Sequence, residues 1–228
     1  MEERKHIVIL AAGDFPTHPV PLKALHEADF VVCCDSAYVE LGVRSSEKPL
    51  VVIGDGDSLS PCTKHQLGDR YIQVDEQDYN DLHKAMDYAT SRFTPHPSSS
   101  GDKRGCLFTI LGATGKREDH TLGNISYLVT FAEEHPGADI EMLTDYGRFC
   151  AMRGCRTFTS HPGQQVSIFT MTPGIPFRGT GLRWPLMDFQ ARLWWQATLN
   201  EALGDSFMLS SEGWLVVFQT YDSKEKIS

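Results

Sequence analysis

The chain has 228 residues, a length that suits one large domain or two small ones, each with a core of its own. Its 41% hydrophobic and 22% charged residues are typical of a globular protein, and no apolar run approaches the roughly 20 residues that cross a bilayer. The formal net charge of −9 disfavours binding to nucleic acid, because an acidic surface repels the phosphate backbone.

The first half of the chain predicts a parallel β-sheet with helices between its strands. Four continuous apolar runs, at 6–11, 30–34, 50–53 and 106–111, have the pattern of strands buried on both faces. Two further segments have the apolar spacing of helices. Their stripes are Leu82, Met86, Ala89 and Phe93 in the first and Leu122, Ile125, Val129 and Ala132 in the second. This alternation predicts an α/β sheet with right-handed crossovers.

The sequence pattern changes after about Tyr146. Residues 94–105, between the first predicted helix and the fourth strand, are rich in Pro, Ser and Gly and are expected to form a loop. Beyond Tyr146, short strand candidates at 149–152, 166–171 and 214–220 alternate with Gly and Pro, and helical periodicity is weak. We therefore expect an α/β domain over 1–146 and a small all-β sandwich over 147–228.

The six cysteines indicate neither a zinc site nor a disulfide framework. None forms a C-x-x-C pair, and Cys33, Cys34 and Cys106 lie in apolar runs where buried thiols are expected. The charged residues 1–6 are followed by an apolar run that is too short for a secretory signal. We expect a cytoplasmic protein without membrane attachment, in which disulfides would not persist.

Acidic and small residues follow three of the predicted strands. The three clusters are Cys34-Asp35-Ser36, Gly54-Asp55-Gly56-Asp57-Ser58, and residues 75–81, which lead into a helix that carries Lys84. Ligands of an open α/β sheet bind outside the carboxyl ends of its strands, so these clusters are expected to converge. Each cluster alone also fits a solvated turn or a helix cap, but three together favour a site. Neighbouring carboxylates repel one another, and Mg²⁺, which prefers oxygen ligands, would offset that repulsion.

A fourth cluster, at 111–120, is a glycine-bearing loop between a strand and a helix, and Asn124 follows it. Such a loop offers backbone N–H groups to an anion at the helix N-terminus, and Lys116 and Arg117 add positive charge. The loop is neither a Walker loop nor a dinucleotide fingerprint. Taken alone, Asp119 also fits a helix cap and His120 a partly buried helix residue.

The four clusters, in this order, resemble the motifs of the thiamin pyrophosphokinase family. That family's pattern is C-A-D-G-G-A, G-D-x-D-S, D-Q-D-x-T-D-x-x-K-A and G-x-x-G-G-R-x-D-H-x-L-x-N, which correspond here to 33–37, 54–58, 76–85 and 112–124. Its C-terminal signature is similar to 181–186 and, more loosely, to 198–200. The chain departs from the pattern at Ser36, Ala37, Asn80 and Lys116, and at 193–198, where the family has a serine-rich segment.

The resemblance implies a Rossmann-like domain followed by a β-sandwich, in a homodimer whose thiamin sites are shared across the subunit interface. It implies Mg²⁺-dependent transfer of the β,γ-diphosphate of ATP to the thiamin hydroxyl, with release of AMP.

The implied metal ligands are Asp55, Asp57, Asp78 and Asp81, and Lys84 and Arg117 would offset charge on the transferred group. The implied ATP contacts are Asp35, Ser58, Gly112, Gly115, Arg117, Asp119, His120 and Asn124. The expected thiamin contacts are Gln77, Trp195, Thr198 and Asn200. Either Trp194 or Trp195 could stack on the flat thiamin cation.

Two alternatives stay open at this point. The altered segment 194–200 is also consistent with an ATP-dependent kinase or pyrophosphokinase of another small alcohol, and the product, ADP or AMP, separates the two types of transfer. A non-catalytic nucleotide or thiamin sensor is the second alternative. The retained aspartates and Lys84 argue against it, because a sensor does not need a full metal site. One of the aspartates is expected to accept the substrate's hydroxyl proton, and the sequence does not single one out.

Overall fold

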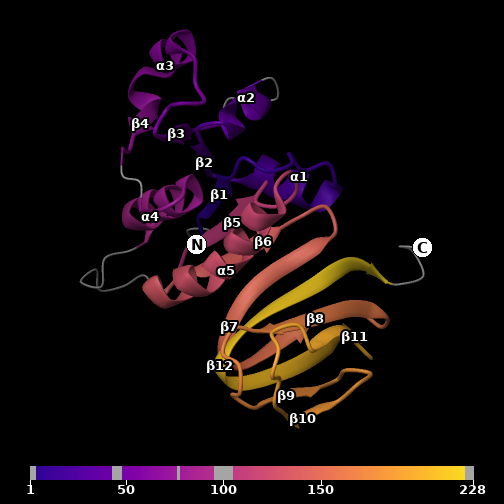
Figure 1. Ribbon diagram of the computed structural model, residues 1–228. Helices are drawn as coiled ribbons and strands as arrows, with labels where there is room; N and C mark the ends of the chain where they lie inside the picture. The colour runs from indigo at the N-terminus through magenta and orange to yellow at the C-terminus, as the bar shows by residue number, and fades with distance from the viewer. Residues whose placement is uncertain (1–3, 43–47, 76–77, 95–104, 224–228) are drawn as a thin grey trace. The chain divides into compact units, whose positions relative to one another are not determined.

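The computed structural model describes residues 4–42, 48–75, 78–94 and 105–223 (Figure 1). The chain divides into two compact units. The first contains the described residues up to 127 together with 133–145, and the second contains 128–132 and the described residues from 146 onward. A separate cluster of buried apolar side chains lies in each unit.

A parallel sheet forms the centre of the first unit. Its strands are β1 (His6–Leu10), β2 (Phe30–Cys34), β3 (Leu50–Gly54), β4 (Tyr71–Gln73), β5 (Leu107–Leu111) and β6 (Asp139–Leu143). They are hydrogen-bonded in the order β6-β5-β1-β2-β3-β4, and every pair is parallel. The chain leaves β1 toward β2 and later places β5 on the other side of β1. A topological switch point therefore lies between β1 and β5, where ligands of such sheets bind.

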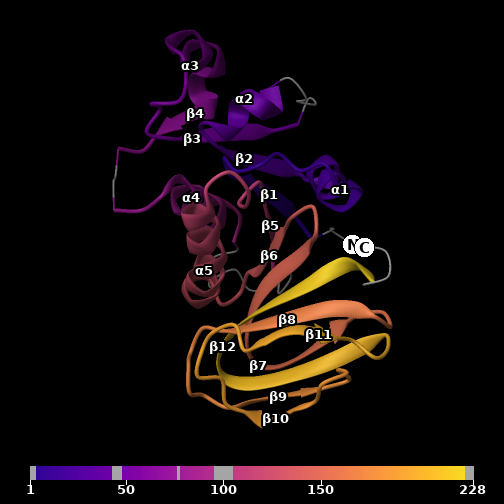
Figure 2. The same ribbon diagram turned by 45° about the vertical axis from the view of Figure 1, so that its right-hand side comes forward.

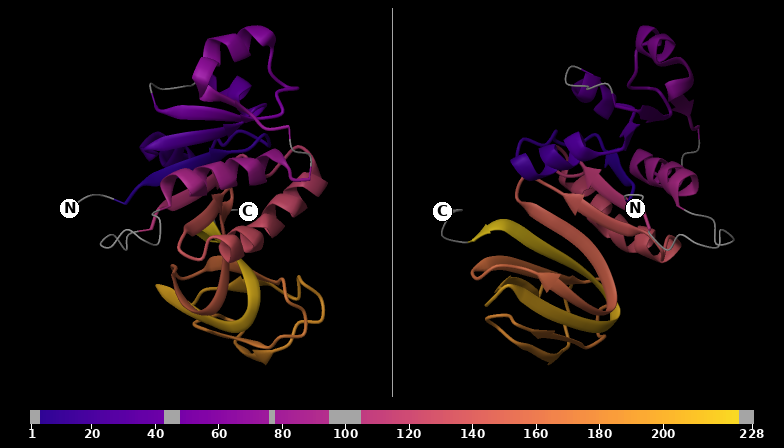
Figure 3. Two further views of the ribbon diagram at one scale, coloured as in Figure 1. Left: turned by 90° about the vertical axis from the view of Figure 1, so that its left-hand side faces the viewer. Right: turned by 180° about the vertical axis from the view of Figure 1, so that it is seen from behind.

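Helices cover the two faces of this sheet. They are α1 (Pro19–Glu27), α2 (Ala37–Gly42), α3 (Pro61–Leu67) with the short 3₁₀ helix η1 (Gly68–Arg70), α4 (Asp81–Phe93) and α5 (Glu118–Glu134). Val8 and Leu10 belong to one core cluster with Ala28, which follows α1, and with Leu41 of α2. The helices α4 and α5 lie side by side on the opposite face (Figures 2 and 3). Successive strand residues point to opposite faces, which is why the strands are apolar throughout.

The second unit is an antiparallel β-sandwich. Its strands are β7 (Gly147–Thr159), β8 (Gln164–Thr170), β9 (Phe177–Thr180), β10 (Leu186–Phe189), β11 (Ala197–Glu201) and β12 (Ser206–Ser223). β12 pairs with β7 on both sides of an irregularity between Ser211 and Leu215. Before the irregularity, the other edge of β12 pairs with β9, and β9 pairs in turn with β10. After the irregularity, that edge of β12 pairs with β8, and β8 pairs in turn with β11. The long strands β7 and β12 thus contribute to both layers, and the facing side chains form one core.

The expected α/β class followed by a β-sandwich is confirmed, and all four apolar runs contain strands. The strand candidates at 149–152 and 214–220 fall within β7 and β12, and the candidate at 166–171 overlaps β8, which ends at Thr170. Helices α1, α2 and α3 and strands β4, β6, β9, β10 and β11 were not predicted. All six cysteines are free thiols, and Cys33, Cys34 and Cys106 are buried as expected. Within the predicted loop, residues 95–104 lie outside the described part of the chain.

The helix α5 exists, but its predicted apolar stripe is only partly confirmed. Leu122 is 54% exposed and Ile125, Val129 and Ala132 are half-buried, whereas the buried positions of the helix are Asn124, Leu128 and Phe131. A buried polar side chain therefore begins the inward face, and apolar spacing could not reveal it. The stripe of α4 is confirmed, with Leu82, Met86 and Ala89 buried. Among the described residues, no helix combines the length and apolar character that a membrane crossing requires.

Candidate active site

An open pocket of about 320 Å³ lies at the carboxyl-end edge of the parallel sheet. It is bounded by the loops that follow β1, β2 and β5 and by the first turns of α4 and α5. Its lining residues are Ala11, Ala12, Gly13, Cys34, Ser36, Asn80, Asp81, Leu82, Ala113, Gly115, Lys116, Arg117, His120 and Asn124. The pocket therefore occupies the switch point between β1 and β5, the usual place for a ligand in this type of sheet.

The loops after β1 and β5 hold one another through their backbones. Three N–H groups of residues 11–14 donate to carbonyls of residues 111–114 at 2.6–2.9 Å. Gly112 has φ +63°, and a Cβ there would lie 2.6 Å from a backbone oxygen of the β1 loop. Gly115 has φ +79°, and a Cβ there would lie 2.1 Å from Oδ2 of Asp14. Both positions therefore require glycine, and they allow the two loops to approach closely.

Lys116 replaces the glycine that the family pattern has next to Gly115. It adopts the left-handed backbone conformation, with φ 55°, at a position where glycine would avoid the steric cost. Its Nζ donates to the carbonyl of Ala12 at 3.0 Å and pairs with Glu40 at 3.0 Å. The substituted side chain therefore ties the β5 loop to the β1 loop and to α2.

The loops after β2 and β3 are also connected. Asp35 is only 1% exposed, and its Oδ2 accepts a hydrogen bond from the N–H of Gly56 at 3.0 Å. Asp55 is half-buried and Asp57 is exposed, and Oδ1 of Asp55 accepts from the N–H of Asp57 at 3.1 Å. A Cβ at Gly56 would lie 2.2 Å from the Tyr71 hydroxyl. Asp35 thus supports the loop that presents the other two aspartates.

Negative charge dominates this part of the unit. Burial raises the pKa of Tyr71, and the carboxylates of Asp35, Asp55, Asp75 and Asp57 raise it further. Burial also raises the pKa of Asp81, followed by the charge of Asp35, while Lys84 lowers it. Carboxylates on several loops thus act on the same groups. Such an arrangement favours a divalent cation that accepts oxygen ligands.

Lys84 is the principal cation beside these carboxylates. It is 8% exposed in the first turn of α4, although a lysine is seldom buried without partners. Its Nζ donates to the carbonyl of Val74 at 3.4 Å and lies 3.8 Å from Oδ1 of Asp81. A second cation, Lys64, lies with its Nζ 5.5 Å from the centroid of the Tyr71 ring. Sequence analysis did not identify Lys64, because it belongs to none of the motifs.

The fourth cluster lies on the opposite wall of the pocket. Arg117 and Asp119 are exposed and form an ion pair, and the hydrogen bond from Arg117 lowers the pKa of Asp119. Oδ1 of Asp119 also accepts from the N–H of His120 at 2.9 Å, and His120 lines the pocket. Asn124 is buried, and its Nδ2 donates to the carbonyl of Ala113 at 2.8 Å. This part of the pocket therefore has exposed charged side chains, Arg117 and Asp119, and the buried side-chain amide of Asn124.

The structure brings part of the predicted site to the pocket. Asp81, Gly115, Arg117, His120 and Asn124 line it. The other N-terminal predictions lie on the loops after β2, β3 and β5, apart from Lys84 and Asp119, which lie in the first turns of α4 and α5. Asp78 is exposed on the segment before α4, and Gln77 lies outside the described residues. Sequence analysis missed Ala11, Ala12, Gly13, Ser36 and Asn80 as lining residues. Gly13, which follows the first apolar run, is the sequence feature that could have indicated the loop after β1.

The predicted residues of the β-sandwich have different environments. Trp195 is 51% exposed, and the N–H of Thr198 donates to its carbonyl at 3.1 Å. The Trp194 ring stacks on Phe169, with centroids 5.3 Å apart. Asn200 is buried, with Oδ1 accepting from the N–H of Trp184 at 3.2 Å and Nδ2 donating to its carbonyl at 2.8 Å. The polar atoms of Asn200 therefore position the Trp184 backbone.

Two family models match the chain. The catalytic domain of thiamin pyrophosphokinase matches residues 22–141, more than half of the chain, and its substrate-binding domain matches residues 147–218. Two curated relatives from Oryza sativa subsp. japonica, thiamine pyrophosphokinase 1 and thiamine pyrophosphokinase 3, are 30% and 33% identical over 154 residues, which is 63% of this chain. The matched parts span 55% and 54% of those relatives, about half of their length.

A solved structure has the same fold. The thiamin pyrophosphokinase from Candida albicans superposes with a TM-score of 0.80 over 96% of this chain and 90% of that one, at 17% sequence identity. At this identity the similarity establishes the fold alone.

Proposed function

Because the chain belongs to the thiamin pyrophosphokinase family, we propose that it transfers a diphosphate group from ATP to thiamin, giving thiamin diphosphate and AMP. One observation carries the proposal within the first unit. Asp81 lines the pocket at the switch point, and burial, followed by the charge of Asp35, raises its pKa. The pocket and a group of carboxylates suited to a cation are therefore adjacent.

The proposed reaction is a displacement at phosphorus. The hydroxyl oxygen of thiamin attacks the β-phosphorus of ATP, and the bond between that phosphorus and the α,β-bridging oxygen breaks, so that AMP leaves. The hydroxyl proton passes to a carboxylate of the aspartate group. Such transfers need mainly positioning and electrostatic stabilisation of the phosphate charge. Lys84 and Arg117 supply fixed positive charge for this purpose.

Magnesium is part of the proposal, with Asp55, Asp57, Asp78 and Asp81 as its ligands. The donor set fits, because Asp55 and Asp57 on the loop after β3 and Asp81 at the start of α4 present carboxylate oxygens. The described cations beside them are Lys84 and Lys64. When bound, Mg²⁺ neutralises phosphate charge and orients the transferred group. Asp35 supports these ligands through its hydrogen bond to Gly56.

We assign ATP binding and thiamin binding to different parts of the chain. The proposed ATP contacts are Asp35, Ser58, Gly112, Gly115, Arg117, Asp119, His120 and Asn124. The proposed thiamin contacts are Gln77, Trp195, Thr198 and Asn200. Residues 1–146 would form the catalytic domain and 147–228 the thiamin-binding and dimerisation domain of a homodimer with shared sites. Six free thiols fit the reducing cytoplasm.

The identity of the products tests the reaction. The purified chain is incubated with ATP, Mg²⁺ and thiamin, and phosphorus NMR follows the mixture. AMP and thiamin diphosphate should accumulate in equal amounts. Accumulation of ADP and thiamin monophosphate would mean that the γ-phosphate alone is transferred. An absence of ATP turnover would instead point to a different alcohol, and ATP consumption without a thiamin product would be hydrolysis.

A further inference from the structure

We propose that the first unit carries a second cation site, for a zinc-type transition metal, between α4 and the end of α5. The ligands are the imidazole of His83 and the carboxylates of Asp87 and Glu134. These side chains are distinct from the proposed magnesium ligands. The inference is independent of the proposed reaction.

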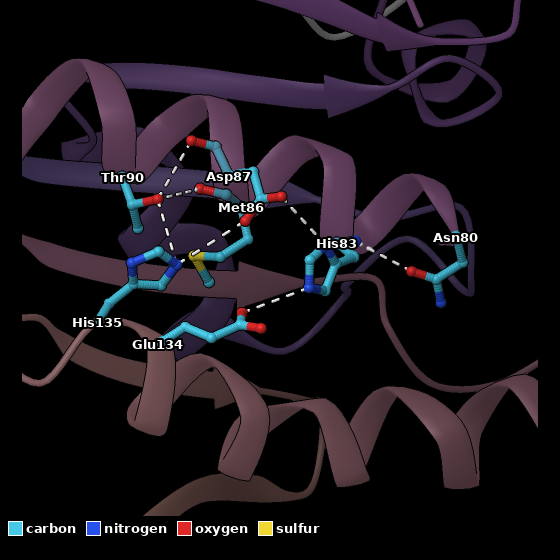
Figure 4. A network of polar contacts seen from close by, with 7 residues as sticks. All are labelled: Asn80, His83, Met86, Asp87, Thr90, Glu134 and His135. Carbon is cyan, nitrogen blue, oxygen red and sulfur yellow. Dashed lines mark hydrogen bonds and ion pairs between the residues drawn. The ribbon is translucent and has the colours of Figure 1, made fainter. Parts of the chain in front are cut away.

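Side chains from two segments converge at this site. His83, Asp87 and Glu134 each place one donor atom within 4.8 Å of the other two. Nδ1 of His83 lies 3.3 Å from Oδ2 of Asp87, one helical turn along α4, and Nε2 lies 3.4 Å from Oε2 of Glu134 on α5. Nε2 of His135 lies 3.9 Å from Oδ1 of Asp87. Figure 4 shows the His83 ring beside Asp87 and Glu134, and His135, which follows α5, beside Asp87 and Thr90.

These separations match the ligand spacing of a metal centre. Charge-assisted hydrogen bonds between nitrogen and carboxylate oxygen are about 2.7–2.9 Å long, shorter than the observed 3.3 and 3.4 Å. Around a tetrahedral ion with bonds of about 2.0–2.2 Å, neighbouring ligand atoms are roughly 3.3–3.6 Å apart. Only one imidazole nitrogen of His83 binds the ion, together with one oxygen of each carboxylate. The carboxylate beside the other nitrogen accepts a hydrogen bond from it through its second oxygen. Such an acceptor orients metal-bound histidines.

The surroundings hold the imidazole in place and leave an entry path. His83 is 4% exposed, and its ring stacks on Tyr79 with centroids 4.2 Å apart and an interplanar angle of 14°. Tyr127 packs against the ring at 5.5 Å. The side chains of Asp87 and Glu134 are 53% and 42% exposed, so an ion can reach them from solvent. One buried ligand and two solvent-facing ones are therefore preorganised.

The donor atoms determine the class of ion. Mg²⁺ prefers an all-oxygen set, whereas imidazole nitrogen suits Zn²⁺ and its neighbours among the transition metals. A mixed nitrogen and oxygen set therefore selects zinc over the magnesium that the aspartate loops would take. Bound there, the ion joins α4 to α5, the helices whose first turns border the pocket. Its role is structural, and it contacts no atom of the proposed reaction.

Zinc binding to the full chain tests this site. In excess Mg²⁺, competition with a chromogenic chelator should give one tight Zn²⁺ per chain. His83→Gln and Glu134→Gln should each weaken that binding by at least about a hundredfold, because each removes a ligand. His65→Gln removes an exposed imidazole on α3 and should leave the affinity unchanged. With free zinc a hundredfold above Kd, the wild-type unfolding temperature should rise by roughly 5 °C or more, and Glu134→Gln should abolish the rise.

Two results would overturn the site. The first is zinc affinity that is the same in the wild type, His83→Gln and Glu134→Gln. The second is an absence of tight zinc binding, which would leave His83 as a bridge between two carboxylates. Should His83→Gln fail to fold, Glu134→Gln still decides the question, because its side chain is largely in solvent. Thiamin turnover is not a readout, so failure of either proposal is seen separately.

Discussion

The side-chain amide of Asn80 donates to Oδ1 of Asn124 at 3.3 Å, across 44 positions of the sequence. Oδ1 of Asn80 caps α4 by accepting from the N–H of His83 at 3.0 Å. Nδ2 of Asn124 donates to the carbonyl of Ala113 at 2.8 Å. This pair therefore links the start of α4, the inward face of α5 and the loop after β5 at one wall of the pocket.

Replacing Asn124 should destabilise the fold. Asn124→Ala leaves the buried carbonyl of Ala113 without its donor, which costs about 1–3 kcal/mol in the free energy of unfolding. Urea denaturation monitored by circular dichroism measures this loss. Ser126→Ala, on the exposed side of α5, is the control and should change stability by less than about 0.5 kcal/mol. Equal effects of the two substitutions would show that the amide anchor is unimportant.

Gly56 should tolerate alanine much less well than Gly174 does. Both have positive φ, +84° and +85°, so alanine costs roughly 1–2 kcal/mol of backbone strain at either position. At Gly56 the added Cβ would also lie 2.2 Å from the Tyr71 hydroxyl, whereas at Gly174 no atom lies within 4 Å. Gly56→Ala should therefore lose more stability in urea, and it should also lose turnover because Asp55 and Asp57 move. Matching losses in both variants would mean that the clash relaxes without cost.

Asp57→Asn should lower turnover by at least about a hundredfold, because it removes a charge that holds the proposed cation on the phosphates. Its side chain is exposed, so the far-UV circular dichroism spectrum and the unfolding midpoint should stay close to wild type. Asp69→Asn makes the same charge change at an exposed residue of η1 and should retain activity. Initial rates over a range of Mg²⁺ concentrations give the comparison. A near-normal rate and Mg²⁺ dependence in Asp57→Asn would remove this residue from the metal site.

Asp81 should make the metal-free protein less stable as the pH rises. Burial, and then the charges of Asp35 and Asp55, raise its folded-state pKa above 3.8, so the folded chain binds this proton more tightly than the unfolded chain does. The free energy of unfolding should therefore fall as the pH rises from about 3.8 through the raised pKa. Asp81→Asn, which does not ionise, should flatten this part of the profile, measured by urea unfolding with EDTA present. Superimposable profiles would contradict the pKa assignment.

The proposed shared sites should allow complementation between two inactive variants. Mixing Asp57→Asn with Trp195→Ala should form heterodimers in which one site carries both lesions and the other carries neither. Activity should recover to a fraction of wild type, although each parent alone is nearly inactive. Subunit exchange, verified by native mass spectrometry with a tagged partner, is the control. Exchange without recovery would mean that each site lies within one chain or that Trp195 does not hold thiamin, and Trp194→Ala in the same mixture separates these two cases.

Short-range patterns in the sequence determined the sheet and the order of its chemical motifs. Continuous apolar runs indicated β1, β2, β3 and β5, because strands buried on both faces need apolar side chains at successive positions. The aspartates after β2 and β3 could be located by their position alone, whereas the cluster at 75–81 follows β4, which was not predicted. Short or partly polar strands such as β4, β6 and β10 carry no comparable signal, because their stability comes from pairing with neighbours.

Tertiary packing decided which residues meet. The loops after β1 and β5 contact one another although they are distant in the sequence, and so do Asn80 and Asn124. The burial of Lys84 likewise depends on the segments that pack around it. The inward face of α5 begins at Asn124 rather than at Leu122, because a buried amide that satisfies the Ala113 carbonyl outweighs apolar periodicity there. His83 and Glu134 lie on different helices, and only the packing of α4 against α5 brings them within 3.4 Å. Hydrophobic periodicity reports which local structure a segment forms, whereas these contacts arise from the fold as a whole.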